Sequence, residues 1–271
     1  MLLAALQTVA QPHVRPEDHF WRRRVVNRLV LSEKINKPLI AHEAAAYSPG
    51  GLFTETNGIV ASLINGLKAG KYLAYDPDNW EKTLAYEDIT RKMQEWDQAL
   101  TGVNEETYAE DSLASDEWAA SFDQPASEPV QDEWGLAPVQ SDLPPPAAWQ
   151  PDLMAYEEVI HMVEDWIFDK NTSSMVYQIA YFEVIWVDPS GALPEKVLAR
   201  FMWKDVLEQL ENTQWQNRFN DAEARSIAEA FELRIFDSFM ISVGGNPIQT
   251  LAEAERRRQE LIEFEHHLWN Y

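Results

Sequence analysis

Apolar side chains recur at helical spacing in three stretches of the first hundred residues. In the first, residues 19–35, aromatic and aliphatic residues alternate with arginines at mostly helical intervals, and Asn36-Lys37-Pro38 ends the pattern because a residue before proline disfavours the α conformation. Gly70 is placed to stop the second helix, and the turn residues 76–79 separate it from the third. The pattern therefore predicts helices over residues 19–35, 52–68 and 86–98.

After residue 151 the pattern takes on β character. Residues 159–168 and 175–187 are rich in Val, Ile, Tyr, Phe and Trp, and the polar residues 170–174 join them, which predicts an antiparallel hairpin. A third strand, residues 197–203, follows the turn Asp188-Pro189-Ser190-Gly191. A small antiparallel sheet is therefore expected in the second half.

Helical spacing returns after this sheet. Residues 205–210, 221–239 and 250–269 fit helices, and Thr250 with Glu253 three residues later forms the sequence pattern of a capping box. Gly244-Gly245-Asn246-Pro247 is expected to end one helix and redirect the chain into the next. Strands and helices in separate runs predict an α+β fold.

A long acidic stretch lies between the two structured parts. Residues 93–169 contain no Lys or Arg but 19 Asp and Glu, and seven of the 15 prolines fall in residues 125–151. Low hydrophobicity with charge of one sign predicts a disordered linker over residues 101–151. Its spaced aromatic residues are either anchors for a partner groove or incidental residues of a solvated linker, and both interpretations stay open. These residues are Trp118, Phe122, Trp134 and Trp149.

The N-terminus reads MLLAALQTVA, a short apolar stretch that ends with small residues at the two positions read by signal peptidase. We expect a signal peptide remnant over residues 1–10 and a mature chain from Gln11; the alternative is that residues 2–6 begin a buried helix. The chain is thus divided into residues 1–10, a mostly helical N-terminal region at 11–100, the acidic linker at 101–151, and a C-terminal α+β region at 152–271.

The amino-acid composition argues against several classes of partner and chemical site. The net charge of -23 repels phosphate backbones, so nucleic acid is not expected as a partner. The absence of cysteine excludes disulfides, thiolate nucleophiles, thiolate zinc sites and iron–sulfur clusters. No apolar run reaches the roughly 18–20 residues that span a bilayer, so no transmembrane span is expected.

The candidate chemical groups do not form a catalytic pattern. His266 and His267 are adjacent on a predicted helix and point about 100° apart, which does not suit two ligands of one metal. Gly50-Gly51 and Gly244-Gly245 lack the longer frames of phosphate-binding loops. The sequence predicts no enzyme, and no catalytic, cofactor-binding or metal-binding residue or cofactor is assigned.

Two arginine triplets, residues 22–24 and 256–258, are the basic clusters of the chain. One interpretation pairs them with the chain's own acidic surplus; the other places them against the acidic surface of a partner, where Arg favours bidentate pairing.

Six stretches of the chain together cover both structured parts, and none is a catalytic signature. They are EKINKPL at residues 33–39, GLKAGK at 66–71, EDWIFDK at 164–170, NDAEAR at 220–225, FDSF at 236–239 and IEFEHHLW at 262–269. Taken in this order, they resemble the GldN/PorN family of type IX secretion and gliding motility proteins of the Bacteroidetes.

The resemblance implies a periplasmic structural subunit at the inner face of the outer membrane. It implies a ring with a GldK/PorK-type lipoprotein, self-association within that ring, and contact with a GldM/PorM-type motor protein. The alternative is a free-standing periplasmic adaptor that binds client proteins through its acidic, Trp-bearing linker.

Overall fold

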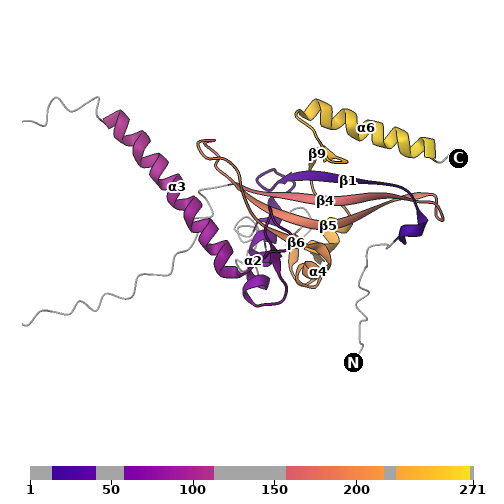
Figure 1. The fold of residues 1–271 in the computed structure, drawn as a ribbon, viewed down its shortest axis with the longest axis horizontal. Helices are drawn as coiled ribbons and strands as arrows, with labels where there is room; N and C mark the ends of the chain where they lie inside the picture. Colours follow the sequence, from indigo (N-terminus) through magenta and orange to yellow (C-terminus); the bar gives the residue numbers. More distant parts are fainter. Residues whose placement is uncertain (1–13, 41–57, 113–156, 217–223, 269–271) are drawn as a thin grey trace, which may run out of the picture.

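The computed structural model describes residues 14–40, 58–112, 157–216 and 224–268. Its central element is an eight-stranded antiparallel sheet in the order β10-β9-β1-β4-β5-β6-β2-β3, and β7 pairs with β8 separately (Figure 1). The predicted α+β class is confirmed. The strands are β1 His19–Val30, β2 Ala74–Tyr75, β3 Thr83–Leu84, β4 Glu157–Asp169, β5 Ser174–Val187, β6 Lys196–Met202, β7 Gln214–Gln216, β8 Ala224–Ser226, β9 Phe239–Val243 and β10 Asn246–Pro247. The helices are η1 Pro16–Asp18, η2 Lys37–Leu39, α2 Ile59–Lys68, α3 Tyr86–Ser112, α4 Trp203–Glu211, α5 Ile227–Glu232 and α6 Leu251–Leu268.

The predicted hairpin and third strand of the second half are confirmed as β4, β5 and β6. Carboxylates fix both connections: Asp169 accepts hydrogen bonds from the Asn171 N–H and the Thr172 hydroxyl, each at 2.9 Å. Asp188 does the same in the next turn, where it accepts from the Ser190 N–H at 2.8 Å. Short polar turns of this kind join neighbouring antiparallel strands. The three strands could therefore be predicted from residues close together in the sequence.

The helix predicted over residues 19–35 is wrong, because residues 19–30 form β1, an interior strand of the sheet. Val25, Asn27 and Leu29 are buried in alternation, which is the period of two that a strand requires. Strand β1 pairs with β4 on one side and β9 on the other. The sheet therefore takes strands from both sides of the acidic stretch.

The helix predicted over residues 221–239 is also wrong over most of its length. Ser226 starts the short helix α5, where its hydroxyl and the Glu229 carboxylate form a reciprocal capping box. The helix stops before Arg234, whose φ of 55° leaves the helical region, and Phe239–Val243 pairs with β1 instead. Gly244 and Gly245, with φ of 59° and 83°, form the hairpin turn between β9 and β10 rather than a helix stop.

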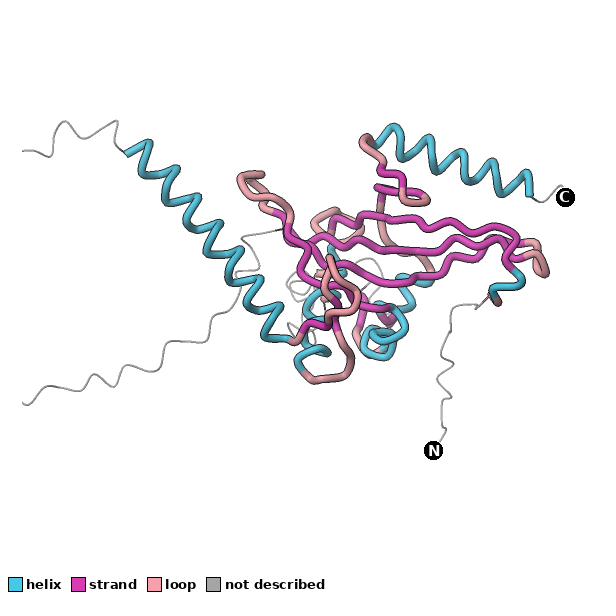
Figure 2. Tube along the Cα trace, in the orientation of Figure 1, coloured by secondary structure: helices cyan, strands magenta, loops and turns pink. Residues whose placement is uncertain are grey.

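The remaining helices agree with the pattern, with one difference in length. Gly70, at φ 69°, stops α2 as predicted. Helix α3 begins at Tyr86 as predicted but continues to Ser112, so residues 101–112 of the predicted linker are helical, and this end projects away from the sheet (Figures 1 and 2). The remainder of the predicted linker with its four aromatic residues, the N-terminal residues 1–10 and the glycine pair at 50–51 lie outside the described residues.

One face of the sheet carries the main core. Helices α2, α4, α5 and the first turns of α3 cover this face, with Phe182, Trp186, Phe201 and Phe231 fully buried among them. A smaller apolar cluster of Val25, Trp166, Met240 and Ala254 lies farther along the same sheet, under α6.

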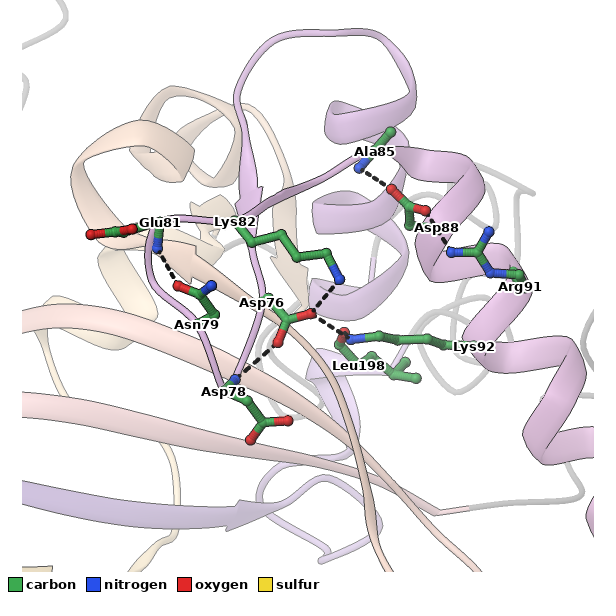
Figure 3. A network of polar contacts seen from close by, with 10 residues as sticks. All are labelled: Asp76, Asp78, Asn79, Glu81, Lys82, Ala85, Asp88, Arg91, Lys92 and Leu198. Carbon is green, nitrogen blue, oxygen red and sulfur yellow. Dashed lines mark hydrogen bonds and ion pairs between the residues drawn. The ribbon is translucent and has the colours of Figure 1, made fainter.

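A polar network ties the β2–β3 hairpin to α3 (Figure 3). Asp76 accepts a hydrogen bond from the Asp78 N–H at 3.0 Å and pairs with Lys82 at 3.2 Å and Lys92 at 3.7 Å. Lys92 in turn donates to the Leu198 carbonyl of β6 at 3.1 Å. The predicted turn between α2 and α3 is confirmed, and its carboxylate fixes the hairpin to its neighbours.

Glu158 gives a pH-dependent test of this core. It lies opposite Trp186, and burial raises its pKa from 4.5 to about 7. A carboxyl with a raised pKa in the native state stabilises below its ordinary pKa, and this contribution is lost as pH rises through 7. Glu158→Gln is therefore expected to be more stable than the parent by about 1–3 kcal/mol at pH 8 and equal to it near pH 4.5, measured by urea unfolding. The matched control is Glu263→Gln, the same substitution at an exposed position of α6.

Candidate protein-binding groove under the C-terminal helix

Helix α6 is held to the sheet by few buried side chains. Only Ala254 of its described residues is buried, whereas Leu251 and Ile262 are 67% and 46% exposed. The Phe264 ring lies 5.2 Å from the Trp21 ring of β1. Figure 1 shows α6 alongside β1 and β9, away from α2 and α4. The helix thus presents apolar side chains that its own chain does not cover within the described structure.

The start of α6 follows the sequence prediction in part. The Thr250 hydroxyl accepts a hydrogen bond from the Glu253 N–H at 3.1 Å, so Thr250 is the N-cap. The Glu253 carboxylate accepts from the Gln249 N–H at 3.4 Å rather than from Thr250. The cap is confirmed, and its reciprocal bond is displaced by one residue.

A cavity of about 500 Å³ separates α6 from the sheet. Four strands of the sheet, β1, β4, β5 and β9, the segment before β9 and one side of α6 contribute to its lining, which mixes apolar and charged side chains. The lining residues are Asn27, Trp166, Tyr177, Arg234, Phe236, Asp237, Ser238, Phe239, Met240, Leu251, Ala254, Glu255, Arg258, Leu261, Ile262 and Glu265. A surface that mixes apolar and charged side chains is typical of protein interfaces.

An ion pair between a buried carboxylate and an arginine lies beside this cavity. Glu164 is fully buried, and Arg234 binds both of its oxygens, with Nη1–Oε1 at 2.6 Å and Nη2–Oε2 at 3.1 Å. Asn27 and the Trp166 indole also donate to Oε2, at 2.7 and 3.3 Å. A buried carboxylate requires such partners, because its desolvation is costly.

Aromatic rings hold the guanidinium of Arg234 in place. Its Cζ lies 5.2 Å from the centre of the Tyr177 ring and 5.6 Å from that of Phe236, within cation–π range. Burial raises the pKa of the Tyr177 hydroxyl. The result is a rigid wall of aromatic and paired charged groups facing a loosely attached helix.

The weak attachment of α6 has a measurable consequence. Local opening requires little free energy where few apolar contacts are broken. We expect amide hydrogen exchange in α6 to be at least ~100-fold faster than in β4 and β5, whose strands are paired on both sides. Mass spectrometry of the exchanging full chain measures this ratio, and equal protection of α6 and β4 would contradict the loose attachment.

The opposite face of the sheet carries an ion-pair network across four strands. Arg28 binds Glu195 at 2.5 and 2.8 Å, and Glu183 pairs with Arg200 at 2.6 Å and with His161 at 3.4 Å. Burial works against ionisation of Glu183, but hydrogen bonds from His161 and Arg200 outweigh it and lower the pKa of Glu183. His161 is thus part of a structural network.

The other histidines named in the sequence do not gather either. His266 and His267 are exposed near the end of α6. Among the described residues, no three His, Asp or Glu side chains are placed to hold a metal ion.

The arginine triplets largely pair within the chain. Arg22 and Arg24 both bind Asp165, at 2.5 and 2.9 Å, and Arg257 binds Glu260 at 2.9 Å. The first of the two interpretations therefore holds for these arginines.

The fold is α+β, and the groove exposes a mixed apolar and charged surface of the kind found at protein interfaces. The chain belongs to the GldN family, because the family model described as gliding motility associated protein GldN matches residues 14–270. It is therefore a component of the gliding motility and type IX secretion machinery, as the resemblance implied. No curated protein in the comparison matches the chain. Within the described residues, none of the helices combines the length and apolar character needed to cross a membrane.

Sequence reasoning did not single out Glu164 and Arg234 as a pair. One signal was available: Glu164 and Asp165 interrupt an otherwise apolar strand, and a carboxylate at such a position needs a cationic partner. The partner itself is 70 residues away, so only the fold identifies it.

Proposed function

We propose that this protein is a structural subunit, without enzymatic activity, of a periplasmic ring at the inner face of the outer membrane. In this proposal it assembles with a GldK/PorK-type lipoprotein and with further copies of itself, and it couples the ring to a GldM/PorM-type motor protein. The groove under α6 is the surface that binds a partner subunit.

One observation carries the proposal. Three of the stretches by which the sequence resembles the GldN/PorN family, far apart in the chain, meet at this groove. Trp166 comes from the stretch at residues 164–170, Phe236 and Phe239 from 236–239, and Ile262 from the C-terminal stretch. Family-like residues that converge on a half-open groove support a shared binding surface there.

The chemistry of the groove supports a protein partner. Leu251 and Ile262 offer apolar area that becomes stabilising once a partner removes it from water. Glu255, Arg258 and Glu265 of α6 supply charges that select the partner and its orientation.

The test is capture of the tagged full chain from envelope extract, followed by imaging of the recovered particles. Recovery of a lipoprotein partner in large rings is expected. The Leu251→Asp variant should lose this capture, whereas Leu73→Asp, at an exposed leucine outside the groove, should keep it. A stable lone monomer in extract that contains the other components would contradict the proposal and favour the adaptor alternative.

A further inference from the structure

The two arginine triplets meet at a second, smaller cavity on the other side of α6. Arg23 of β1 and Arg257 of α6 line the same space of about 210 Å³, 234 residues apart in sequence. The apolar part of the lining comes from the β9–β10 hairpin and the residue after it. The remaining lining residues are Val243, Asn246, Pro247, Ile248 and Glu253.

Positive charge at this place exceeds the carboxylates that pair with it. On α6, Glu253 pairs with Arg256, and Glu260 pairs with both Arg256 and Arg257. Arg23 has no ion-pair partner among the described residues. In a chain of net charge -23, this is a local basic site with capacity for further carboxylates.

The backbone beside this site is open as well. Strand β9 pairs with β1 only at Val25–Arg28, and the Gly244 N–H reaches the Arg24 carbonyl at 2.7 Å. In the described part of the chain, no strand lies beside residues 19–23 on the side away from β4. An open edge of this kind accepts an extended segment through main-chain hydrogen bonds.

The chain contains a segment with the complementary chemistry. The tripeptide Asp-Glu-Trp occurs twice, at residues 116–118 and 132–134, within a stretch that has no Lys or Arg. Paired carboxylates suit the two guanidinium groups, and an indole suits an apolar wall beside arginine.

Chain length selects the second of the two motifs. Arg23 lies opposite Trp166, nine residues along β4 from its start, or about 30 Å. Trp134 precedes Glu157 by 23 residues, which can extend over about 75 Å.

The first motif cannot reach the same place. Trp118 follows the end of α3 at Ser112 by six residues, or at most about 20 Å. That end of α3 lies far from α6 (Figure 1).

We propose that Asp132-Glu133-Trp134 docks in the cleft between β1 and α6 of its own chain, with its carboxylates on Arg23 and Arg257 and its indole against Val243 and Ile248. This contact adds to the few that attach α6, and it does not depend on the proposed ring function.

The cysteine-free chain permits a direct test by disulfide trapping in the full-length protein. Gly135→Cys, next to Trp134, is combined with Asn246→Cys in the cleft, and oxidised glutathione serves as the oxidant. The matched control combines Ala119→Cys, next to Trp118, with the same Asn246→Cys. The intramolecular disulfide is expected to form readily in the first pair, because docking raises the local concentration of the thiol, and not in the second pair, whose thiol the end of α3 holds out of reach.

The arginines provide the second arm. Adding Arg23→Ser and Arg257→Ser should slow the 135–246 disulfide roughly tenfold, because the undocked thiol meets the thiol at position 246 only by diffusion of its segment, whereas the exposed Lys204→Ser should leave the rate unchanged. Equal rates for the 135 and 119 pairs, or no effect of the arginine changes, would overturn the proposal. A disulfide-linked dimer as the main product would also overturn it, since the segment would then come from a neighbouring copy.

Discussion

Arg234→Ala is expected to lower the free energy of unfolding by about 3–5 kcal/mol, the largest effect of a single substitution outside the apolar core. The variant leaves the fully buried Glu164 with only neutral donors, Asn27 and the Trp166 indole. An uncompensated buried carboxylate destabilises the native state far more than a surface pair contributes. The melting temperature should fall by roughly 10 °C, measured by calorimetry.

The control for this experiment is Arg256→Ala, because the Arg256 side chain is 64% exposed and its ion pairs within the described residues are with Glu253 and Glu260 on its own helix. Its expected change is within about 0.5 kcal/mol. A similarly small change for Arg234→Ala would show that the ion pair between Glu164 and Arg234 does not stabilise the wall of the groove.

Ala254→Arg is expected to detach α6 and to weaken partner binding at least ~10-fold while most of the global stability remains. Ala254 is the one buried residue among the described positions of α6, and it belongs to the small cluster with Val25, Trp166 and Met240. A long charged side chain cannot be accommodated there without moving the helix. Detachment removes one wall of the groove, whereas the main core on α2, α4 and α5 is untouched.

Hydrogen exchange of α6 and a titration with the partner lipoprotein measure the two halves of this prediction. Ala252→Arg is the matched control, because Ala252 is exposed two residues earlier on the same helix. Normal binding by Ala254→Arg, with α6 fully exchanging, would show that the docked helix is not needed for recognition.

The parts of the fold that could be predicted are those determined by local pattern. Strands β4 to β6 have continuous β-branched and aromatic runs bounded by Asp-initiated turns, and both signals lie within a few residues. The cap at Thr250 and the stop at Gly70 are likewise local.

Strand β1 was missed for a physical reason. Its adjacent Val25 and Val26 and its run of arginines fit helical spacing as well as alternation, and Asn27 puts a polar residue on the buried side. That asparagine is tolerated because Glu164 accepts its hydrogen bond, from 137 residues away. Pairing with distant strands therefore determines that residues 19–30 form a strand, and local propensity does not predict this.

The groove, like β1, depends on contacts between residues far apart in the sequence. Its apolar residues were visible in the sequence as parts of predicted elements, but the ion pair of Glu164 with Arg234 joins positions 70 residues apart. An isolated arginine after a short helix resembles any surface arginine in sequence. Only the strand interrupted by acids indicated that a cation had to be found.

The most direct test of the central claim is mass photometry of the purified full chain mixed with a purified GldK/PorK-type lipoprotein. We predict particles much larger than a one-to-one complex, which Leu251→Asp in the groove abolishes and Leu73→Asp outside it does not. If the two proteins stay separate at micromolar concentration, or if large particles form equally well with Leu251→Asp, the assignment of the groove under α6 as the assembly surface is contradicted.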